Sequence, residues 1–388
     1  VALEGGVMIA REALPRILFL SYESLDNTHG TGVLLQRMFR DFPRENLFAV
    51  SVVSTGGSPW LENQILLPDN VFESECARLL QQTLKGHTFS PQIVYSTAFN
   101  ENDLRLLRIA IESVEYSTPV VQHFMDMAPH DAREFANGFR SLNSRVSELW
   151  ALTQSMGREL EQTFGRQVQI VSALHQDPPQ SSKTRHVRFS STFRAVMIGN
   201  LWQPQLLPFL REVWSLCQAD LPSLRPIDWY IHPARVQKLI EGGYELGDEI
   251  VWRGFYDGFH LQQKLQSADL ALLPFNWGSK ADSGYARFSL PSRLTEYCAA
   301  GLPVVAVASP DTAPAQFIND RGCGVAISGS TPTQVAHKLK QLIEDHEWRT
   351  QAGIQARRLS AGEFSLEPFT QWLRTRLMKI VDESTPKS

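Results

Sequence analysis

A glutamate stands at position 296, inside a short and otherwise mostly small or apolar stretch of the sequence, SLPSRLTEYCAAGLPVVAV. Pro291 suits a first helical turn and Gly301 suits the position after a helix, so the spacing predicts a helix over 291–300. Ser292 shares one face of that helix with Glu296. Backbone N–H groups at a helix start attract a diphosphate, and a carboxylate about one turn later can accept hydrogen bonds from ribose hydroxyls. The pattern therefore favours a nucleotide-sugar, and the alternative is a glutamate on a solvated helix face.

A histidine and an aspartate come at the end of an expected strand in PVVQHFMDM. Open parallel sheets bind ligands at the carboxyl ends of their strands, so His123 and Asp126 are candidates for contact with a substrate. The alternative for His123 is a buried histidine whose hydrogen bonds are satisfied inside the protein. His130 and Asp131 follow and rank second, because Asp131 can also cap a helix.

Two glycines, Gly30 and Gly32, stand between an expected strand and an expected helix near the start of the chain. Glycines at such a place let the backbone approach a phosphate or a sugar, and a flexible loop is the alternative. A dinucleotide fingerprint that began at Gly30 would need a third glycine where the chain has Leu35. This difference weighs against an NAD-dependent oxidoreductase.

Strand-like and helix-like patterns alternate along the chain, and these elements must position the candidate residues. A polar stretch rich in proline and serine, HQDPPQSSKTRH, separates two such series at 175–186. The alternation predicts an α/β protein with two Rossmann-like, doubly wound parallel sheets, in domains at 1–178 and 190–362 that face each other across a ligand-binding cleft. Helical apolar spacing over 366–388 predicts a last helix that packs on the first domain. The expected strands lie at 16–20, 48–54, 92–96, 119–124, 149–153, 168–174, 193–200, 227–232, 249–255, 269–275, 303–309 and 324–328.

The amino-acid composition limits the classes of protein to which this chain can belong. The chain has 388 residues, of which 43% are hydrophobic, and this suits two well-buried domains. A formal net charge of −4 offers no basic footprint for nucleic acid or for an anionic membrane. The four cysteines form no CxxC pair and no Asp-x-Asp pair follows a strand, so we expect no disulfide framework and no metal. No apolar run suits a membrane span or a signal peptide, and the expected location is the cytoplasm.

The run PSRLTEYCAAGLPVVAV resembles the signature of retaining, glycogen-synthase-like glycosyltransferases of the GT-B fold, also described as group 1 or family 4-like enzymes. The stretches VWRGFYDGFHLQQKLQSADLALLPF and ELWALTQSMGRELEQTFGRQVQIV are similar to other parts of that family. The resemblance implies that Gly254 and Phe255 face the nucleobase and that His123 lies near the donor sugar. It implies that Gly30 and Gly32 line the cleft beside the diphosphate. The residues that it implies for donor binding in the signature are Ser289, Leu290, Pro291, Ser292, Arg293 and Glu296.

Two departures from the family pattern concern charged residues. Phe288 stands eight residues before Glu296, where many members have a glutamate that contacts the donor sugar. The stretch IGNLWQPQLL lacks the Arg and Lys that hold the phosphates in many members, and the nearest cations are Arg287, Lys280 and Arg293. We favour Arg287, because it lies just before the expected helix and its guanidinium can fork onto diphosphate oxygens.

The resemblance implies a hexosyl- or related glycosyltransferase that moves a sugar from a nucleotide-diphosphate sugar, a UDP- or GDP-sugar by preference, to an acceptor hydroxyl. It implies retention of configuration without a metal or another cofactor, with attack from the leaving-group side and the departing phosphate helping to take the acceptor proton. The sequence does not identify the acceptor and leaves a glycan, a protein or a small molecule open. One alternative is a non-catalytic GT-B subunit that binds a partner, which the two departures favour. The other is a nucleotide-sugar 2-epimerase, for which no specific set of carboxylates is found.

Overall fold

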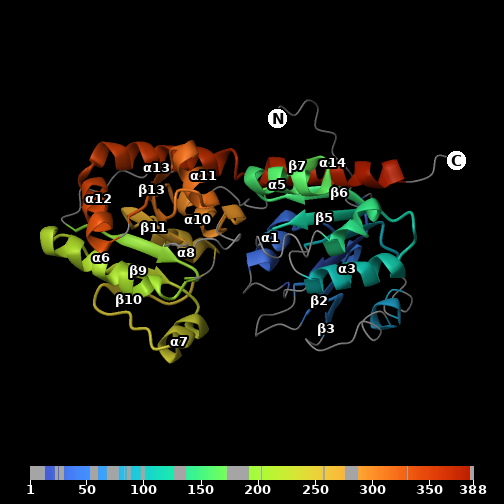
Figure 1. The fold of residues 1–388 in the computed structure, drawn as a ribbon, viewed down its shortest axis with the longest axis horizontal. Helices are drawn as coiled ribbons and strands as arrows, with labels where there is room; N and C mark the ends of the chain where they lie inside the picture. Colours follow the sequence, from blue (N-terminus) through green and yellow to red (C-terminus); the bar gives the residue numbers. More distant parts are fainter. Residues whose placement is uncertain are drawn as a thin grey trace. The chain divides into compact units, whose positions relative to one another are not determined.

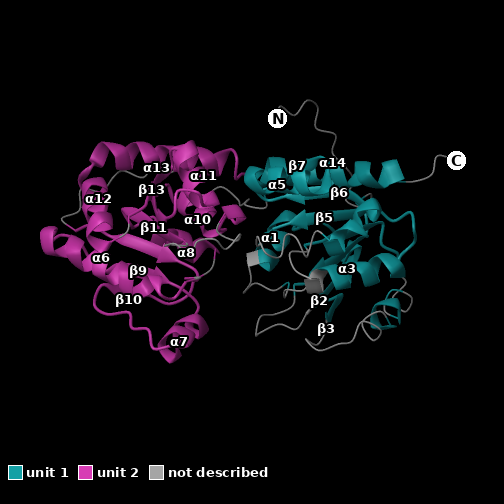
Figure 2. Cartoon of the chain, in the orientation of Figure 1, with its two compact units in different colours: residues 1–175, 366–388 teal, residues 176–365 magenta. Residues whose placement is uncertain are grey.

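The computed structural model divides the chain into two compact units (Figure 1, Figure 2). Unit 1 comprises Val1–His175 and Leu366–Ser388, and unit 2 comprises Gln176–Ser365. The structure describes residues 14–21, 25, 30–52, 60–67, 78–82, 84, 89–97, 101–125, 137–172, 192–201, 203–256, 258–275, 287–329 and 331–384.

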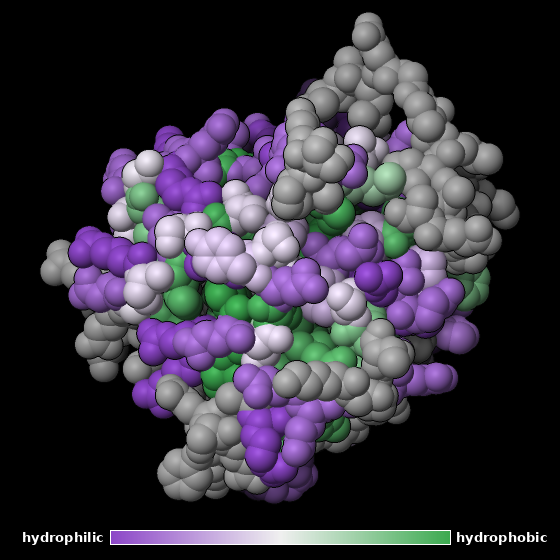
Figure 3. Space-filling model, turned by 90° about the vertical axis from the view of Figure 1, so that its right-hand side faces the viewer, coloured by the Kyte–Doolittle hydropathy of each residue, from purple (hydrophilic) through white to green (hydrophobic). Residues whose placement is uncertain are grey.

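Unit 1 is built on a seven-stranded parallel sheet in the order β3-β2-β1-β4-β5-β6-β7. Its central strands are buried along their whole length, as expected for a parallel sheet with both faces covered. Figure 3 shows one face of this unit, on which hydrophilic side chains surround a band of apolar ones. The strands are β1 (Ile17–Ser21), β2 (Leu47–Val52), β3 (Gln64–Leu67), β4 (Ile93–Ser96), β5 (Val120–Phe124), β6 (Val146–Ala151) and β7 (Val168–Ile170), and the helices include α1 (Gly30–Met38), α3 (Glu101–Ser113), α5 (Gln154–Phe164) and α14 (Leu366–Ser384).

The last helix of the chain, α14, packs within unit 1 (Figure 2). Leu373 of this helix is fully buried, and the Trp372 ring lies 5.7 Å from the ring of Trp150 on β6. Arg376 forms an ion pair with Glu148 of the same strand, with Nε 3.1 Å from Oε2. The C-terminal segment therefore covers the sheet of the unit in which the chain begins.

Unit 2 is built on a six-stranded parallel sheet in the order β10-β9-β8-β11-β12-β13. One face of this sheet forms a continuous apolar core with α6 and α12, in which Trp229, Leu272 and Trp214 are almost fully buried. The strands are β8 (Ala195–Ile198), β9 (Ile227–Tyr230), β10 (Ile250–Trp252), β11 (Leu270–Phe275), β12 (Val304–Ala308) and β13 (Gly324–Ile327), and the helices include α6 (Leu206–Asp220), α7 (Pro233–Glu241), α8 (Gly258–Leu265), α10 (Arg293–Ala300), α11 (Ala313–Arg321), α12 (Pro332–Glu344) and α13 (His346–Ala361).

The α/β class and the two doubly wound parallel sheets expected from the sequence are confirmed. Each expected strand overlaps a strand of the structure, whereas the edge strand β3 at Gln64–Leu67 was not expected, because its four residues show no alternation of apolar and polar side chains. The helix expected over 291–300 begins two residues later, at Arg293. The sequence also predicts a cleft between the two domains. This cleft depends on how the domains are placed relative to each other, and it stays a prediction.

Candidate functional site

The order of the strands in unit 2 reverses between β8 and β11, and open sheets bind ligands at such a point. These two strands pair only through Ala195 and Val196 with Leu270 and Ala271, and they part beyond this register. The backbone groups that the parting strands leave unpaired need other partners, because buried N–H and C=O groups are almost always hydrogen-bonded. Helix α10 supplies these partners.

Tyr297 of α10 bridges the two parting strands with its hydroxyl group. The hydroxyl accepts a hydrogen bond from the Ile198 N–H, at 2.9 Å, and donates one to the Leu272 carbonyl oxygen, at 3.0 Å. Burial raises the pKa of Tyr297 to about 12, so the hydroxyl keeps its proton and can act as donor and acceptor at neutral pH. The helix is thereby fixed to the carboxyl ends of both strands.

Arg293 adds a second connection from the first turn of α10 to the same strand ends. Its Nη1 lies 3.0 Å from the Ile198 oxygen and 2.8 Å from the Asn200 oxygen, and its Nη2 lies 3.5 Å from the Pro274 oxygen. The residue is 8% exposed, and burial lowers the pKa of its guanidinium. The sequence predicted a donor-binding residue here, but the structure directs the guanidinium into the unit. Arg293 therefore positions α10, and an anion at the helix start would meet backbone N–H groups instead.

Residues 287–292 lead into α10 at the carboxyl edge of the sheet. Phe288 and Leu290 are buried, whereas Arg287 is exposed and its guanidinium carbon lies 5.2 Å from the centre of the Phe288 ring. Ser292 occupies the N-cap position without a side-chain capping bond, and its carbonyl oxygen accepts from the Thr295 hydroxyl at 2.8 Å. The predicted cation thus lies just before the helix start, at the surface.

Glu296 lies in the first turn of α10 and is partly exposed. Gln262 of α8 donates from Nε2 to Glu296 Oε2 at 2.8 Å and lies 3.1 Å from the Glu296 backbone oxygen. This double contact fixes the direction of the carboxylate. Sequence reasoning missed Gln262, because no local pattern connects two residues that lie on different helices.

The end of β10 presents aromatic side chains at the same edge of the sheet. Gly254 has φ of 95°, a conformation that side chains disfavour, and its oxygen accepts from the Ile231 N–H at 3.0 Å. Phe255 is 54% exposed, and its ring lies 5.2 Å from that of His232 at an angle of 71°. An exposed aromatic surface of this kind suits the flat face of a nucleobase. His232 was not predicted as a site residue; its position at the end of the strand expected at 227–232 was the available signal.

His123 of unit 1 is enclosed in the core of that unit. Its Nδ1 accepts from the Tyr95 hydroxyl at 2.6 Å, its Nε2 donates to the Val171 oxygen at 3.0 Å, and the residue is 0% exposed. Burial lowers the pKa of His123 to about 3, so the ring is neutral at physiological pH. The structure therefore gives His123 a core position with both ring nitrogens occupied, against the expectation that it reaches a donor sugar.

The remaining predicted residues divide into two groups. Gly30 and Gly32 lie in the first turn of α1, which follows β1, so they belong to a helix start and not to an extended glycine loop. The predicted residues that lie outside the described part of the chain are Asp126, His130, Asp131 and Lys280.

Comparison with known proteins shows which family this site resembles. Residues 232–359, which contain Gly254, Phe255 and the whole of α10, match the family model for glycosyl transferases group 1. This part of the chain is therefore similar to group 1 glycosyl transferases, in agreement with the resemblance of the sequence. A comparison with curated protein sequences gave no match.

Solved structures show the fold of the whole chain. Anabaena HepE in complex with UDP and glucose is 15% identical, with a TM-score of 0.68, over 94% of this chain and 100% of that one. Sucrose-phosphate synthase from Thermosynechococcus elongatus is 11% identical, with a TM-score of 0.68, over 95% and 99%. WaaG, a glycosyltransferase involved in lipopolysaccharide biosynthesis, is 15% identical, with a TM-score of 0.58, over 96% and 100%. The chain has the GT-B fold, as predicted.

Two further observations concern the part of the chain that the structure describes. No helix there is long and apolar enough to cross a membrane. No group of three or more His, Cys, Asp or Glu side chains in the same residues is arranged to hold a metal ion.

Proposed function

We propose that this protein is a glycosyltransferase that moves a sugar from a nucleotide-diphosphate sugar to an acceptor hydroxyl, with retention and without a metal ion. The observation that carries the proposal is the start of α10 at the reversal point of the unit 2 sheet, with the Glu296 carboxylate held in its first turn. This helix lies inside the segment that matches group 1 glycosyltransferases. The similar HepE chain was solved with UDP-glucose, which supports a UDP-sugar as the first donor to test, with a GDP-sugar second.

Each binding role follows from a local property of the site. The backbone N–H groups of residues 289, 290, 292 and 293 and the helix dipole attract the diphosphate, whereas Pro291 has no N–H. Glu296, held by Gln262, accepts hydrogen bonds from the ribose hydroxyls. Phe255, paired with His232, contacts the base. Arg287 is exposed before the helix start, and its guanidinium can turn to the diphosphate oxygens.

The proposed reaction exchanges one bond at the anomeric carbon of the donor sugar. The bond from this carbon to the diphosphate oxygen breaks, and a bond to the acceptor oxygen forms on the same face of the sugar. The hydroxyl proton of the acceptor passes to the departing phosphate oxygen. Arg287 and the helix start stabilise the negative charge that grows on the leaving group, so the protein acts by position and electrostatics and needs no attacking side chain.

Calorimetric titration with UDP and GDP, followed by a donor-hydrolysis assay with and without a chelator, tests the proposal. The Glu296→Gln variant is expected to bind the nucleotide more weakly by about 1–3 kcal/mol, because a charge-assisted hydrogen bond becomes a neutral one. The Glu347→Gln variant, in the first turn of α13, is the control and is expected to bind as the wild type does. Equal affinity of the wild type and Glu296→Gln would remove Glu296 from the site, and a loss of turnover that Mg²⁺ restores would refute metal independence.

A non-catalytic, nucleotide-sugar-binding subunit is the second candidate. It is favoured by Phe288, an apolar residue that is 2% exposed at the position where many relatives of this kind have a sugar-contacting glutamate. Tight nucleotide binding without hydrolysis or transfer of any donor would support this candidate over the enzyme.

A further inference from the structure

Unit 2 contains a cavity of about 380 Å³ that lies away from the start of α10. Most of its lining residues precede strands β8, β9 and β11, whereas the candidate donor site follows the strands. The cavity is lined by Thr192, Arg194, Arg225, Asp228, Arg253, Ser267 and Asp269. Three arginines therefore surround one small cavity, in a chain that carries a net negative charge.

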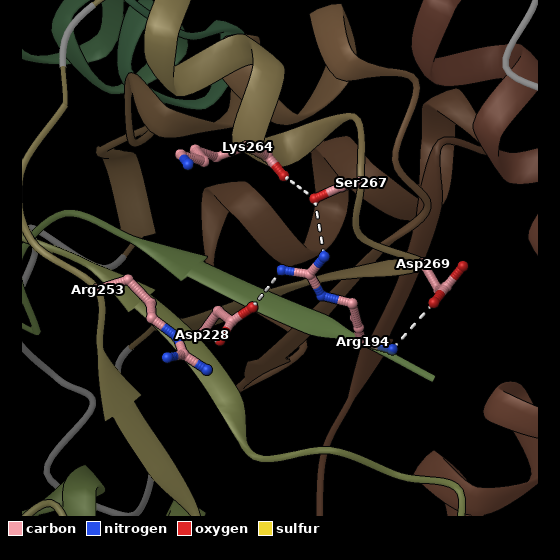
Figure 4. A network of polar contacts seen from close by, with 6 residues as sticks. All are labelled: Arg194, Asp228, Arg253, Lys264, Ser267 and Asp269. Carbon is pink, nitrogen blue, oxygen red and sulfur yellow. Dashed lines mark hydrogen bonds and ion pairs between the residues drawn. The ribbon is translucent and has the colours of Figure 1, made fainter. Parts of the chain in front are cut away.

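A buried carboxylate holds two of the three arginines in place. Asp228 of β9 is 3% exposed and accepts from Arg194 Nη2 at 2.8 Å and from Arg253 Nε at 2.6 Å. Figure 4 shows the two guanidinium groups approaching this carboxylate from different sides. An ion pair with a buried carboxylate holds its geometry best when the other N–H donors of the arginine are also hydrogen-bonded. The other hydrogen bonds of Arg194 therefore show how firmly this pair is held.

Arg194 has two such contacts beside the cavity (Figure 4). Its Nη1 donates to Ser267 Oγ at 3.1 Å, and its backbone N–H donates to Asp269 Oδ2 at 2.9 Å. Ser267 Oγ in turn donates to the Lys264 backbone oxygen at 2.7 Å. The Lys264 ammonium group lies 5.4 Å from the Tyr256 ring. Lys264 thus holds Ser267 through its backbone.

The arginines carry more donors than these contacts use. Within the described part of the chain, the Arg253 guanidinium forms hydrogen bonds through Nε alone, so its two terminal nitrogens stay available. Arg225 is exposed, and its guanidinium takes part in none of the hydrogen bonds or ion pairs found among the described residues. The charge of Asp228 is shared by Arg194 and Arg253. The lining as a whole has three arginines and two aspartates, Asp228 and Asp269, so one positive charge is left over (3 − 2) when Arg225 is included.

We propose that this cavity is a second anion site, which binds a small phosphate-bearing molecule separately from the nucleotide-sugar. Guanidinium groups present paired N–H donors that match phosphate oxygens, and Arg194, Arg225 and Arg253 all line this cavity. A volume of about 380 Å³ lies in the range of small-molecule sites. A purely structural network around Asp228 would need Arg194 and Arg253 but not Arg225.

Titration of the full chain with inorganic phosphate, by calorimetry at constant ionic strength, tests the proposal. The wild type is expected to show saturable binding, and Arg225→Ala is expected to bind phosphate about tenfold more weakly, because a charged donor pair is lost. Arg225→Lys, which keeps the charge but not the paired donors, is expected to lie between them. The control is Arg358→Ala, which removes an exposed arginine of α13 outside the cavity and is expected to match the wild type.

A second variant separates this site from the donor site. Arg287→Ala, at the start of α10, is expected to keep the phosphate binding that Arg225→Ala weakens, because Arg287 does not line this cavity. Phosphate binding that is lost in Arg287→Ala and kept in Arg225→Ala would overturn the proposal, as would a wild type that shows no saturable binding. Glycerol 3-phosphate in place of phosphate distinguishes the sources of the anion: tighter binding indicates a phosphate ester, and equal binding indicates the free ion. The titrations need no transferase activity, so their outcome is independent of the proposed function.

Discussion

The two units differ in the burial of a titratable side chain near the end of a central strand. In unit 1, His123 lies within β5, and its ring is enclosed by Tyr95, Trp150 and the Val171 oxygen. In unit 2, Glu296 lies on the helix that follows the strand, and part of its surface is exposed. A strand inside a sheet directs its side chains into the covering layers, whereas the first turn of the next helix stands at the edge of the sheet. Position near a strand end therefore indicates a ligand contact only for residues beyond the last paired residue.

The largest expected effect concerns Arg293, a buried charged residue of unit 2. Arg293→Met is expected to lower the free energy of unfolding of unit 2 by about 3–5 kcal/mol, because several buried carbonyl oxygens lose their donor. Urea unfolding measures this effect. Arg358→Met, on the exposed side of α13, is the control, with an expected change within about 0.5 kcal/mol. An equally small effect of Arg293→Met would show that α10 does not depend on this contact.

The next prediction concerns Arg287, the exposed cation before the same helix. Arg287→Ala is expected to raise the activation free energy of donor hydrolysis by about 2–4 kcal/mol, since the charge on the leaving diphosphate is greatest in the transition state. Arg287→Lys is expected to recover part of the rate, because lysine keeps the positive charge but lacks the paired N–H donors of the guanidinium. Single-turnover kinetics with a UDP-sugar measure both variants, and a wild-type rate in Arg287→Ala would contradict the assignment.

The third prediction uses the buried histidine of unit 1. The pKa of His123 is about 3 in the folded state, below the ordinary value of about 6.5 expected on unfolding, so between these values the unfolded state binds more protons. The contribution of the neutral His123 ring to the free energy of unfolding is therefore fully present above about pH 6.5. It is lost as pH falls from about 6.5 to about 3, by about 1.4 kcal/mol for each pH unit in this range.

The variant His123→Gln is expected to remove this part of the pH dependence. Urea unfolding between pH 7.5 and 5 measures the difference between the slopes of the wild type and the variant. His337→Gln, at an exposed position of α12, is the control and is expected to keep the wild-type slope. A wild-type slope in His123→Gln would mean that the ring is not held neutral in the core.

The smallest expected effect concerns Gln262, which holds Glu296. Gln262→Ala is expected to weaken nucleotide binding by about 1 kcal/mol, because the carboxylate loses the hydrogen bond that fixes its direction. In Glu296→Gln/Gln262→Ala the two effects are expected not to add, since the residues act through one contact. The adjacent, exposed Gln263 provides the control, Gln263→Ala. Additive losses in the double variant would show that Gln262 acts separately from Glu296.

Sequence patterns predicted the elements of the site because these elements depend on local geometry. Gly301 ends α10 in the left-handed conformation with φ of 65°, and its N–H donates to the Cys298 oxygen at 2.9 Å, as a glycine after a helix suggests. Glycine at this position also leaves room for the Arg357 side chain, which no local pattern shows. A side chain at this position would overlap with Arg357 of α13.

The sequence by itself determined the alternation of strands and helices, the limits of α10 to within two residues and the presence of Glu296 in its first turn. Only the tertiary structure decided where the polar side chains point: Arg293 inward to the parting strands, His123 into a core, and Gln262 against Glu296. The physical reason is the range of each interaction. Helix and strand patterns arise from backbone geometry over a few residues, whereas a buried donor takes whichever acceptor the packing of distant elements leaves without a partner.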